Sequence, residues 1–338
     1  MQKKRFLTGI KPTGEPHLGN YFGAILPSIE LSKNPENEVF LMCADWHGLT
    51  NKQSIFVPGE FSLKIIATYL ALGFSLEGNS IFLQSDFPEI QEISWYLSCA
   101  TASGMLERSH AYKDALANNK LPTAALLYYP ILMAADILTF DTQYVPVGKD
   151  QLQHLEYASD MAKLFNNLVN KPVFVEPKPI IQKTEVLVGT DGDKKMSKSY
   201  HNVIPLFAPK NILEKKVKEI KTDSKGLNEQ KDPETTLIFQ LFKTFACPAA
   251  VQYMQEKLKN GVHYGYGHAK ADFIDEYEKF FGEKRDLYSY YCNHPDVVAG
   301  LLEQGYHRSK KYAVEVVKRA RDALGLSSFK QKSLPGGV

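Results

Sequence analysis

The chain has 338 residues, of which 44% are hydrophobic and 23% are charged, and its formal net charge is +2. This is the composition of a globular protein with room for two domains, and no apolar run reaches the roughly 18 residues that a membrane span needs. Its four cysteines form no C-x-x-C pair, which argues against a zinc knuckle or a dithiol redox motif. The basic N-terminus leads into a strand without a long apolar stretch, so we expect no signal peptide and a cytoplasmic protein.

The N-terminal part alternates short apolar runs with amphipathic stretches. The apolar runs predict strands at residues 5–10, 38–45, 80–85 and 142–147. The amphipathic stretches predict helices at residues 18–33, 59–72, from 88 onward, 124–140 and 149–165. This alternation predicts an α/β fold with a Rossmann-type doubly wound parallel sheet. Ligands in such folds bind at the carboxyl ends of the strands, where His17 and Asp45 are expected to lie.

From about residue 205 the strand-like runs stop. The remaining periodic stretches predict helices at residues 210–221, 234–246, 250–260, 267–281 and 312–324. We therefore expect a catalytic domain at residues 1–206 and a smaller all-helical domain at residues 207–338, with a frayed tail after about residue 326. Residues 1–206 hold 18 Lys and Arg against 21 Asp and Glu, and residues 207–338 hold 22 against 17, which permits a nucleic-acid-facing C-terminal part.

Two segments carry groups suited to phosphate chemistry. The first is His17-Leu18-Gly19-Asn20, which follows a strand and a Pro/Gly-rich turn and opens a helix, so that free backbone N–H groups can face an anion. The second is Lys195-Met196-Ser197-Lys198-Ser199, whose lysines and hydroxyls can stabilise charge on a departing pyrophosphate. Taken singly, the first could be an ordinary strand–helix turn with an incidental histidine, and the second a solvated basic loop.

A third segment, residues 128–136, places a carboxylate among apolar residues. If it is helical, Tyr129, Met133 and Asp136 share one face. A carboxylate in such surroundings needs a partner, and an indole N–H is a donor that it can bind. Asp136 could instead be a helix cap or a surface residue in a salt bridge.

Together these segments resemble a known family. His17–Asn20 resembles the HIGH motif of the class I aminoacyl-tRNA synthetases, with Asn20 in place of the last histidine, and residues 195–199 match their KMSKS signature. The Met-Ala-Ala-Asp segment at residues 133–136 and residues 145–156 are similar to the tryptophanyl-tRNA synthetases. The resemblance covers the chain to about residue 325, and it also includes residues 8–14, 106–108, 265–267 and Lys270.

The tyrosine enzymes of this class share both nucleotide motifs and an aspartate on the equivalent helix, so they are the main competing assignment. They usually have tyrosine at the position of Leu7, Gln-Ala-Tyr-Asp at residues 133–136 and tryptophan at the position of Leu152, and all three differences favour tryptophan. The chain could also be a catalytically idle paralogue that binds ATP and tryptophan or RNA, or a different adenylyltransferase of the superfamily. The intact lysines count against the idle paralogue, and the helical C-terminal part counts against the different adenylyltransferase.

The resemblance implies a ligase that forms tryptophanyl-adenylate from ATP and then charges tRNA(Trp). It implies catalytic roles for His17, Asn20, Lys195 and Lys198. It implies ATP contacts from Lys11, Pro12, Thr13, Gly19, Asn20, Gly148, Lys149, Asp150, Val186, Lys195, Met196, Ser197, Lys198 and Ser199, although Lys149 stands where the family commonly has an acidic residue. It implies a tryptophan pocket of Tyr129, Met133, Asp136 and Gln151. Mg²⁺ would enter with ATP without a metal site of the protein's own, the helical domain would read the anticodon, and the chain would form a homodimer.

Overall fold

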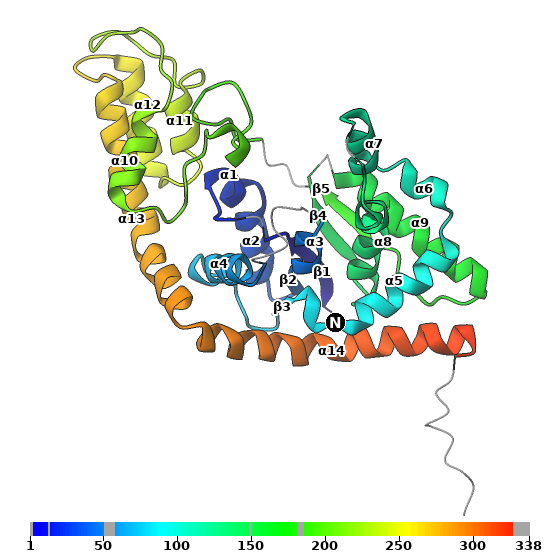
Figure 1. Cartoon of the computed structure of the whole chain (residues 1–338). Coiled ribbons are helices and arrows are strands. Elements are labelled where there is room, and N and C mark those ends of the chain that lie inside the picture. Colours follow the sequence, from blue (N-terminus) through cyan, green and yellow to red (C-terminus); the bar gives the residue numbers. More distant parts are fainter. Residues whose placement is uncertain are drawn as a thin grey trace, which may run out of the picture.

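The computed structural model describes residues 3–12, 14–50, 58–119, 121–148, 151–181 and 186–326. Five strands form one parallel sheet in the order β3-β2-β1-β4-β5 (Figure 1). Their bounds are β1 (Lys4–Ile10), β2 (Asn37–Cys43), β3 (Ser80–Leu83), β4 (Tyr144–Val147) and β5 (Lys178–Ile181). The predicted parallel α/β sheet is confirmed. The strand order reverses between β1 and β4, and this is the position where open parallel sheets bind ligands.

The fifth strand was not predicted from the sequence. β5 lies at the edge of the sheet and all four of its residues are exposed, so it lacks the apolar face that reveals a strand in a sequence. Pro179 fits an edge position because an edge strand leaves one row of backbone groups unpaired.

The centre of the sheet is buried on both faces, as the near-continuous apolar run of β2 predicts. Alternate residues of β2 enter two different cores: Val39 and Leu41 pack on one face, and Phe40 and Met42 on the other. The helices of the N-terminal part are α1 (Leu18–Asn20), α2 (Leu26–Lys33), α3 (Asp45–Gly48), α4 (Pro58–Ala71), α5 (Pro88–Ala100), α6 (Ser103–Glu107), α7 (His110–Ala117), α8 (Ala124–Leu138) and α9 (Leu152–Val169).

The helix predicted at residues 18–33 contains a π-helical turn. This turn, Tyr21–Ile25, joins α1 to α2, and the N–H of Leu26 donates to the carbonyl of Tyr21. Pro27 follows directly and has no N–H to donate, so the widened turn lets the helical run continue past the proline. Pro130 likewise lies inside α8 without ending it.

The C-terminal part is helical, as predicted. Its helices are α10 (Lys210–Lys218), α11 (Leu237–Phe242), α12 (Pro248–Asn260), α13 (Tyr266–Asn293) and α14 (Pro295–Leu324). Helices α10, α11 and α12 gather beside the sheet domain, and the long α13 leads from them to α14 (Figure 1). Among the described residues, no helix combines the length and apolar character needed to cross a membrane.

The last helix, α14, packs mainly against the N-terminal part of the chain. It runs along one side of the N-terminal part (Figure 1) and contacts β3 and α5. Arg308 donates to the backbone carbonyls of Leu76 and Asn79. Gly305 comes so close to β3 that a side-chain carbon there would lie 2.0 Å from the carbonyl oxygen of Ile81. The sequence therefore continues past residue 206 into a helix that helps to close the sheet domain.

Candidate active site

The two predicted phosphate segments meet in space, although 177 residues separate their contacting positions. The backbone N–H of Gly19 donates to the sulfur of Met196 over 3.2 Å. Leu18 N donates to the carbonyl oxygen of Ile204 over 2.9 Å, and His17 forms an antiparallel bridge with Pro205. The turn after β1 and the loop of residues 189–199, here called the signature loop, are therefore one structural unit at the carboxyl ends of the strands.

His17 is buried at the start of this helical run and stays neutral near pH 7. Burial, followed by the charges of Lys198 and Lys195, lowers its pKa from 6.5 to about 4. Its Nδ1 atom has no hydrogen-bond partner among the described residues. A neutral imidazole carries one N–H donor and one acceptor, so His17 can bind a phosphate oxygen without adding a third positive charge beside the lysines.

The lysines of the signature loop differ in their surroundings. Lys198 lies over the turn that precedes His17, with Nζ 3.1 Å from the point where a side chain on Gly14 would begin. Both lysines are exposed, but partial burial of its ammonium group lowers the pKa of Lys198. The hydroxyls of Ser197 and Ser199 lie 2.9 Å apart. The loop thus presents two ammonium groups and two hydroxyls beside the start of a helix, an arrangement suited to a polyphosphate.

The remaining predicted nucleotide residues are less uniform. Lys11 donates from Nζ to the hydroxyl of Thr50 over 2.9 Å, and burial lowers its pKa. Asn20 accepts the backbone N–H of His17 at Oδ1 over 3.1 Å and so fixes the turn. Met196 is buried, and its side chain joins the two segments instead of facing solvent. The other positions are Pro12, which is buried beside Gly48, Gly148 at the end of β4, and the exposed Val186. Thr13, Lys149 and Asp150 lie outside the described residues.

Asp136 is buried on α8 and both of its oxygens accept hydrogen bonds. His47 Nε2 lies 2.8 Å from Oδ2, and Gln84 Nε2 donates to Oδ1 over 2.7 Å. The oxygen of the Gln84 amide accepts the backbone N–H of Trp46 over 3.1 Å, which fixes the amide orientation. Burial raises the pKa of Asp136, and the hydrogen bonds from His47 and Gln84 oppose this rise. Each carboxylate oxygen has two lone pairs, so the group can accept a further donor.

The predicted neighbours of Asp136 only partly surround it. Tyr129 packs edge-on against His47 at 4.8 Å between ring centroids, and burial and the charge of Asp136 raise its pKa. Met133 is half-buried in the same core. Gln151 is exposed at the start of α9, where His154 packs against Tyr129 at 5.6 Å. The structure thus brings Tyr129 and Asp136 together around His47.

Sequence reasoning missed His47, Gln84 and His154. His47 follows β2 and Gln84 follows β3, so both lie at the sheet edge where the first two segments were expected. The position of His47 and Gln84 after strands could have been used to predict them as site residues. Their pairing with Asp136 could not have been predicted, because it depends on how α8 packs on the sheet.

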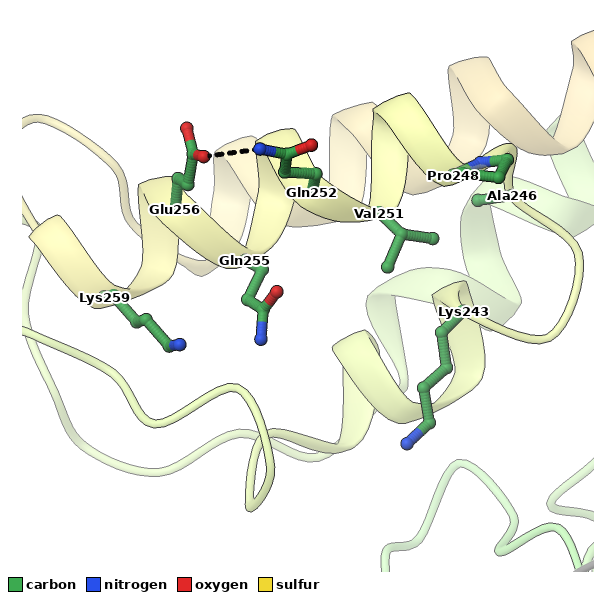
Figure 2. Close-up of a pocket in the computed structure, with 8 residues that line it drawn as sticks. All are labelled: Lys243, Ala246, Pro248, Val251, Gln252, Gln255, Glu256 and Lys259. Atoms are coloured by element: carbon green, nitrogen blue, oxygen red, sulfur yellow. Dashed lines mark hydrogen bonds between the residues drawn. The ribbon is translucent and has the colours of Figure 1, made fainter.

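A groove lies in the helical part (Figure 2). This groove, of about 680 Å³, lies between α11 and α12. Its lining residues are Lys243, Ala246, Pro248, Val251, Gln252, Gln255, Glu256 and Lys259. Gln255 points into the groove between Lys243 and Lys259, and Val251 supplies an apolar wall. Gln252 donates to Glu256 over 3.0 Å and is thereby turned along its helix.

The described residues contain no group of three His, Cys, Asp or Glu side chains placed to hold a metal ion. The groups that the first site could offer to an anion are lysine ammonium, imidazole and backbone N–H groups. A cation that accompanies a polyphosphate can be ligated by the phosphates and water, as Mg²⁺ commonly is.

Comparison with known proteins identifies the family. The profile of the tRNA synthetases class I (W and Y) matches residues 1–282. A protein of Rhodopirellula baltica named tryptophan–tRNA ligase is 41% identical over 323 residues, which cover 95% of this chain and 99% of the relative. A protein of Fusobacterium nucleatum with the same name is 40% identical over 324 residues, covering 96% and 98%. The crystal structure of the Campylobacter jejuni tryptophanyl-tRNA synthetase complexed with ADP and tryptophan superposes with a TM-score of 0.88 at 38% identity, covering 95% and 99%. The chain therefore belongs to the class I tRNA synthetase family of the tryptophan and tyrosine enzymes.

Proposed function

We propose that the chain is a tryptophan–tRNA ligase, which activates L-tryptophan with ATP and transfers it to tRNA(Trp). The observation that carries an amino-acid site beside the phosphate segments is the buried Asp136 carboxylate, oriented by His47 and Gln84 on the same edge of the sheet. The relatives at about 40% identity are named tryptophan–tRNA ligases, which favours tryptophan over tyrosine. Leu7 and Leu152 agree with this choice.

In the first step, the tryptophan carboxylate attacks the α-phosphorus of ATP, and the bond to pyrophosphate breaks. Lys195, Lys198 and the loop hydroxyls offset the negative charge that develops on the pyrophosphate. Neutral His17 donates a hydrogen bond to a phosphate oxygen. In the second step, a ribose hydroxyl at the 3′ end of the tRNA attacks the acyl carbon and AMP leaves. Neither step needs a covalent enzyme intermediate, so catalysis is positioning and charge stabilisation.

Within the ATP subsite, we assign the remaining contacts to the predicted residues. Gly19 and Asn20 lie at the helix start and Pro12 in the turn before it; Lys11, Gly148 and Val186 complete the described part. Thr13, Lys149 and Asp150 are kept as predictions. We take Mg²⁺ to enter as part of the nucleotide substrate, ligated mostly by phosphate oxygens and water.

In the tryptophan subsite, Asp136 accepts the indole N–H, and Tyr129 and Met133 pack against the ring. Gln151 is assigned to the same substrate. A site built to bond a substrate N–H discriminates strongly against analogues that lack it.

The helical domain, with the groove between α11 and α12, is assigned to the anticodon. Lys243 and Lys259 supply charge for phosphates, Gln255 supplies an amide for a base edge, and Val251 supplies an apolar contact. The basic residues of α14 are less suited to this role. Arg308, Lys310 and Arg319 are engaged with the sheet domain: Arg308 donates to the carbonyl of Leu76, Lys310 pairs with Glu89 at 2.7 Å, and Arg319 donates to Asp141 over 2.9 Å.

A homodimer is also part of the proposal. Large apolar side chains are exposed on α5, α7 and α9, which lie on the same side of the sheet (Figure 1). They are Trp95, Leu116, Leu164 and Leu168. Such a surface is typical of an interface between subunits. Sedimentation of the wild type and of Trp95→Asp tests this: the variant is expected to sediment as a monomer, and a wild-type monomer at micromolar concentration contradicts the dimer. We place the enzyme in the cytoplasm, where its tRNA substrate is charged.

The central test is ATP–pyrophosphate exchange with each amino acid in turn, followed by charging of tRNA. Exchange that depends on tryptophan, with tRNA charging, is the expected result. Exchange that depends on tyrosine would establish the sister activity, and binding of ATP and tryptophan without exchange would establish a regulatory paralogue.

A further inference from the structure

The signature loop is closed at its base by one buried side chain. Asn202 is only 2% exposed. Its Oδ1 accepts the backbone N–H of Ser197 over 2.8 Å, and its Nδ2 donates to Asp191 Oδ2 over 2.9 Å and to the carbonyl of Lys195 over 3.2 Å. A single amide therefore holds the beginning and the end of the loop together.

The backbone around this amide is shaped to admit it. A side-chain carbon on Gly189 would lie 2.1 Å from Asn202 Nδ2, so a larger residue there cannot coexist with the amide in its present position. Thr190 N donates to the carbonyl of Asn202 over 2.9 Å. Met196 N donates to Leu187 O over 2.8 Å. Backbone hydrogen bonds thus fix the loop at two points, and the side-chain amide of Asn202 lies between them.

The same segment also holds the histidine turn. Two residues after Asn202, the carbonyl of Ile204 accepts the N–H of Leu18 over 2.9 Å, and Pro205 bridges to His17. Asn202 holds Ser197, and the two residues Ile204 and Pro205 hold the histidine turn. A displacement of Asn202 therefore moves Ser197 and Lys198 relative to His17. Near-attack geometry is sensitive to shifts of about 1 Å, which can cost roughly 100-fold in rate.

We propose that Asn202 is a positioning residue for adenylate formation. It contacts no substrate; it fixes the backbone at Ser197 and thereby sets where Lys195 and Lys198 meet the phosphates of ATP. This inference rests on the proposed function, which assigns those two lysines to the pyrophosphate. A residue that merely stabilised a surface turn would change the melting temperature without separating the kinetics of ATP from those of tryptophan.

The test is Asn202→Asp in the full-length enzyme. The substitution keeps an acceptor for Ser197 N–H, replaces the donor by a carboxylate facing Asp191, and leaves the carbonyl of Lys195 without its side-chain donor. We expect kcat/KM for ATP in pyrophosphate exchange to fall by about 10- to 100-fold, the range for a lost charge-assisted hydrogen bond with misplaced groups. The KM for tryptophan should stay within about twofold.

A second substitution provides the rescue. Adding Asp191→Asn restores one donor–acceptor pair with the roles exchanged, and we expect it to recover at least about fivefold of kcat/KM for ATP. Gly189→Ala displaces the amide without changing its chemistry and should reproduce the ATP defect. The matched control is Asn166→Asp, which alters an amide that binds Val173 N and Phe174 O in a different loop. This control should leave the ATP kinetics unchanged.

Amide hydrogen exchange gives a readout that requires no activity. Peptides covering residues 189–199 should exchange faster in Asn202→Asp than in the wild type, whereas peptides of α8 should not. Unchanged amide hydrogen exchange at residues 189–199 of Asn202→Asp overturns the inference. Wild-type ATP kinetics in this variant also overturn it. A rise in the KM for tryptophan as large as the fall in kcat/KM for ATP, without rescue by Asp191→Asn, also overturns it. If the wild type shows no tryptophan-dependent pyrophosphate exchange, the proposed function is contradicted instead. The amide hydrogen exchange of the loop still decides the role of Asn202 in that case.

Discussion

Gly19 and Met196 join the two halves of the nucleotide site, because the N–H of one donates to the sulfur of the other over 3.2 Å. A side-chain carbon on Gly19 would lie 3.2 Å from Cβ of Met196 and 3.1 Å from the ring of His17. The absence of a side chain at Gly19 therefore allows the turn after β1 and the signature loop to approach each other. The predictions below follow from this joined site and from the groups around it.

Lys198→Ala should slow tryptophan activation by at least about 100-fold, the scale of losing one preorganised charge donor. The loss should fall on kcat more than on the KM for tryptophan, since the lysine acts on charge that develops as pyrophosphate leaves. Pre-steady-state measurement of adenylate formation checks this. Lys194→Ala is the matched control, because that ammonium lies over the ring of Tyr200 at 4.9 Å. Activation at the wild-type rate in Lys198→Ala contradicts the assignment.

Asp136→Ala should raise the KM for tryptophan and remove most discrimination against an isosteric analogue with sulfur at the indole nitrogen. Affinity for ATP without tryptophan should hardly change. The variant should also unfold more easily, because His47 and Gln84 lose their acceptor, at about 1–3 kcal/mol for each unsatisfied buried donor.

A stability-matched control separates these two effects. Asp141→Ala removes the partner of Arg319 in the turn after α8 and should lower the melting temperature without altering discrimination. If Asp136→Ala melts early yet discriminates like the wild type, Asp136 is structural. The choice of tryptophan would then depend on Leu7 and the segment around Gln151.

Reversing the charge of Lys243 and Lys259 together should weaken tRNA binding and reduce its salt dependence, because two phosphate contacts are lost. Pyrophosphate exchange without tRNA should be unaffected. Lys279→Glu, on an exposed part of α13, is the control. Filter binding across a salt series measures the effect. Wild-type affinity and an unchanged salt slope would show that the groove does not hold the tRNA.

The free energy of unfolding should fall as the pH drops from about 6.5 towards 4, in part because of His17. Its pKa is lowered from 6.5 to about 4 in the folded protein, so in this window the unfolded chain binds a proton that the folded chain does not. The contribution approaches about 1.4 kcal/mol per pH unit. In urea titrations, His17→Asn should lose less stability between pH 6.5 and 4.5 than the wild type. His307→Asn, at an exposed position, should follow the wild type, and parallel curves for all three would contradict the lowered pKa.

The fold was predictable where the pattern of side chains records burial. Four strands and most long helices were predicted because their apolar residues follow a recognisable pattern. Examples are the continuous apolar run of β2 and the apolar helix α8. β5 was missed because all four of its residues are exposed. Residues 295–311 were not predicted as helix, although they continue α14. Their contacts with β3 and α5 come from tertiary packing, which no local pattern reveals.

The candidate site shows the same division. His17, Lys198 and Asp136 stand out because their chemistry is concentrated in short segments of the sequence. Gln84 and Asn202 do not, because an amide is recognised as important only when its partners are known. Asp136 reaches Gln84 across 52 positions in the chain, and this distance explains why sequence reasoning named the carboxylate and missed its donor.

The position of α14 has a consequence for synthesis of the protein. Ala313, Val316 and Ala320 belong to the same core as Phe40 and Phe82, and Tyr312 packs against Phe40 at 5.6 Å between ring centroids. A nascent chain on the ribosome therefore has the strands β2 and β3 long before it has the helix that completes their core. Until residue 320 has emerged, this aromatic face stays incompletely covered, and a premature stop within α14 leaves a chain that exposes it to chaperones and proteases.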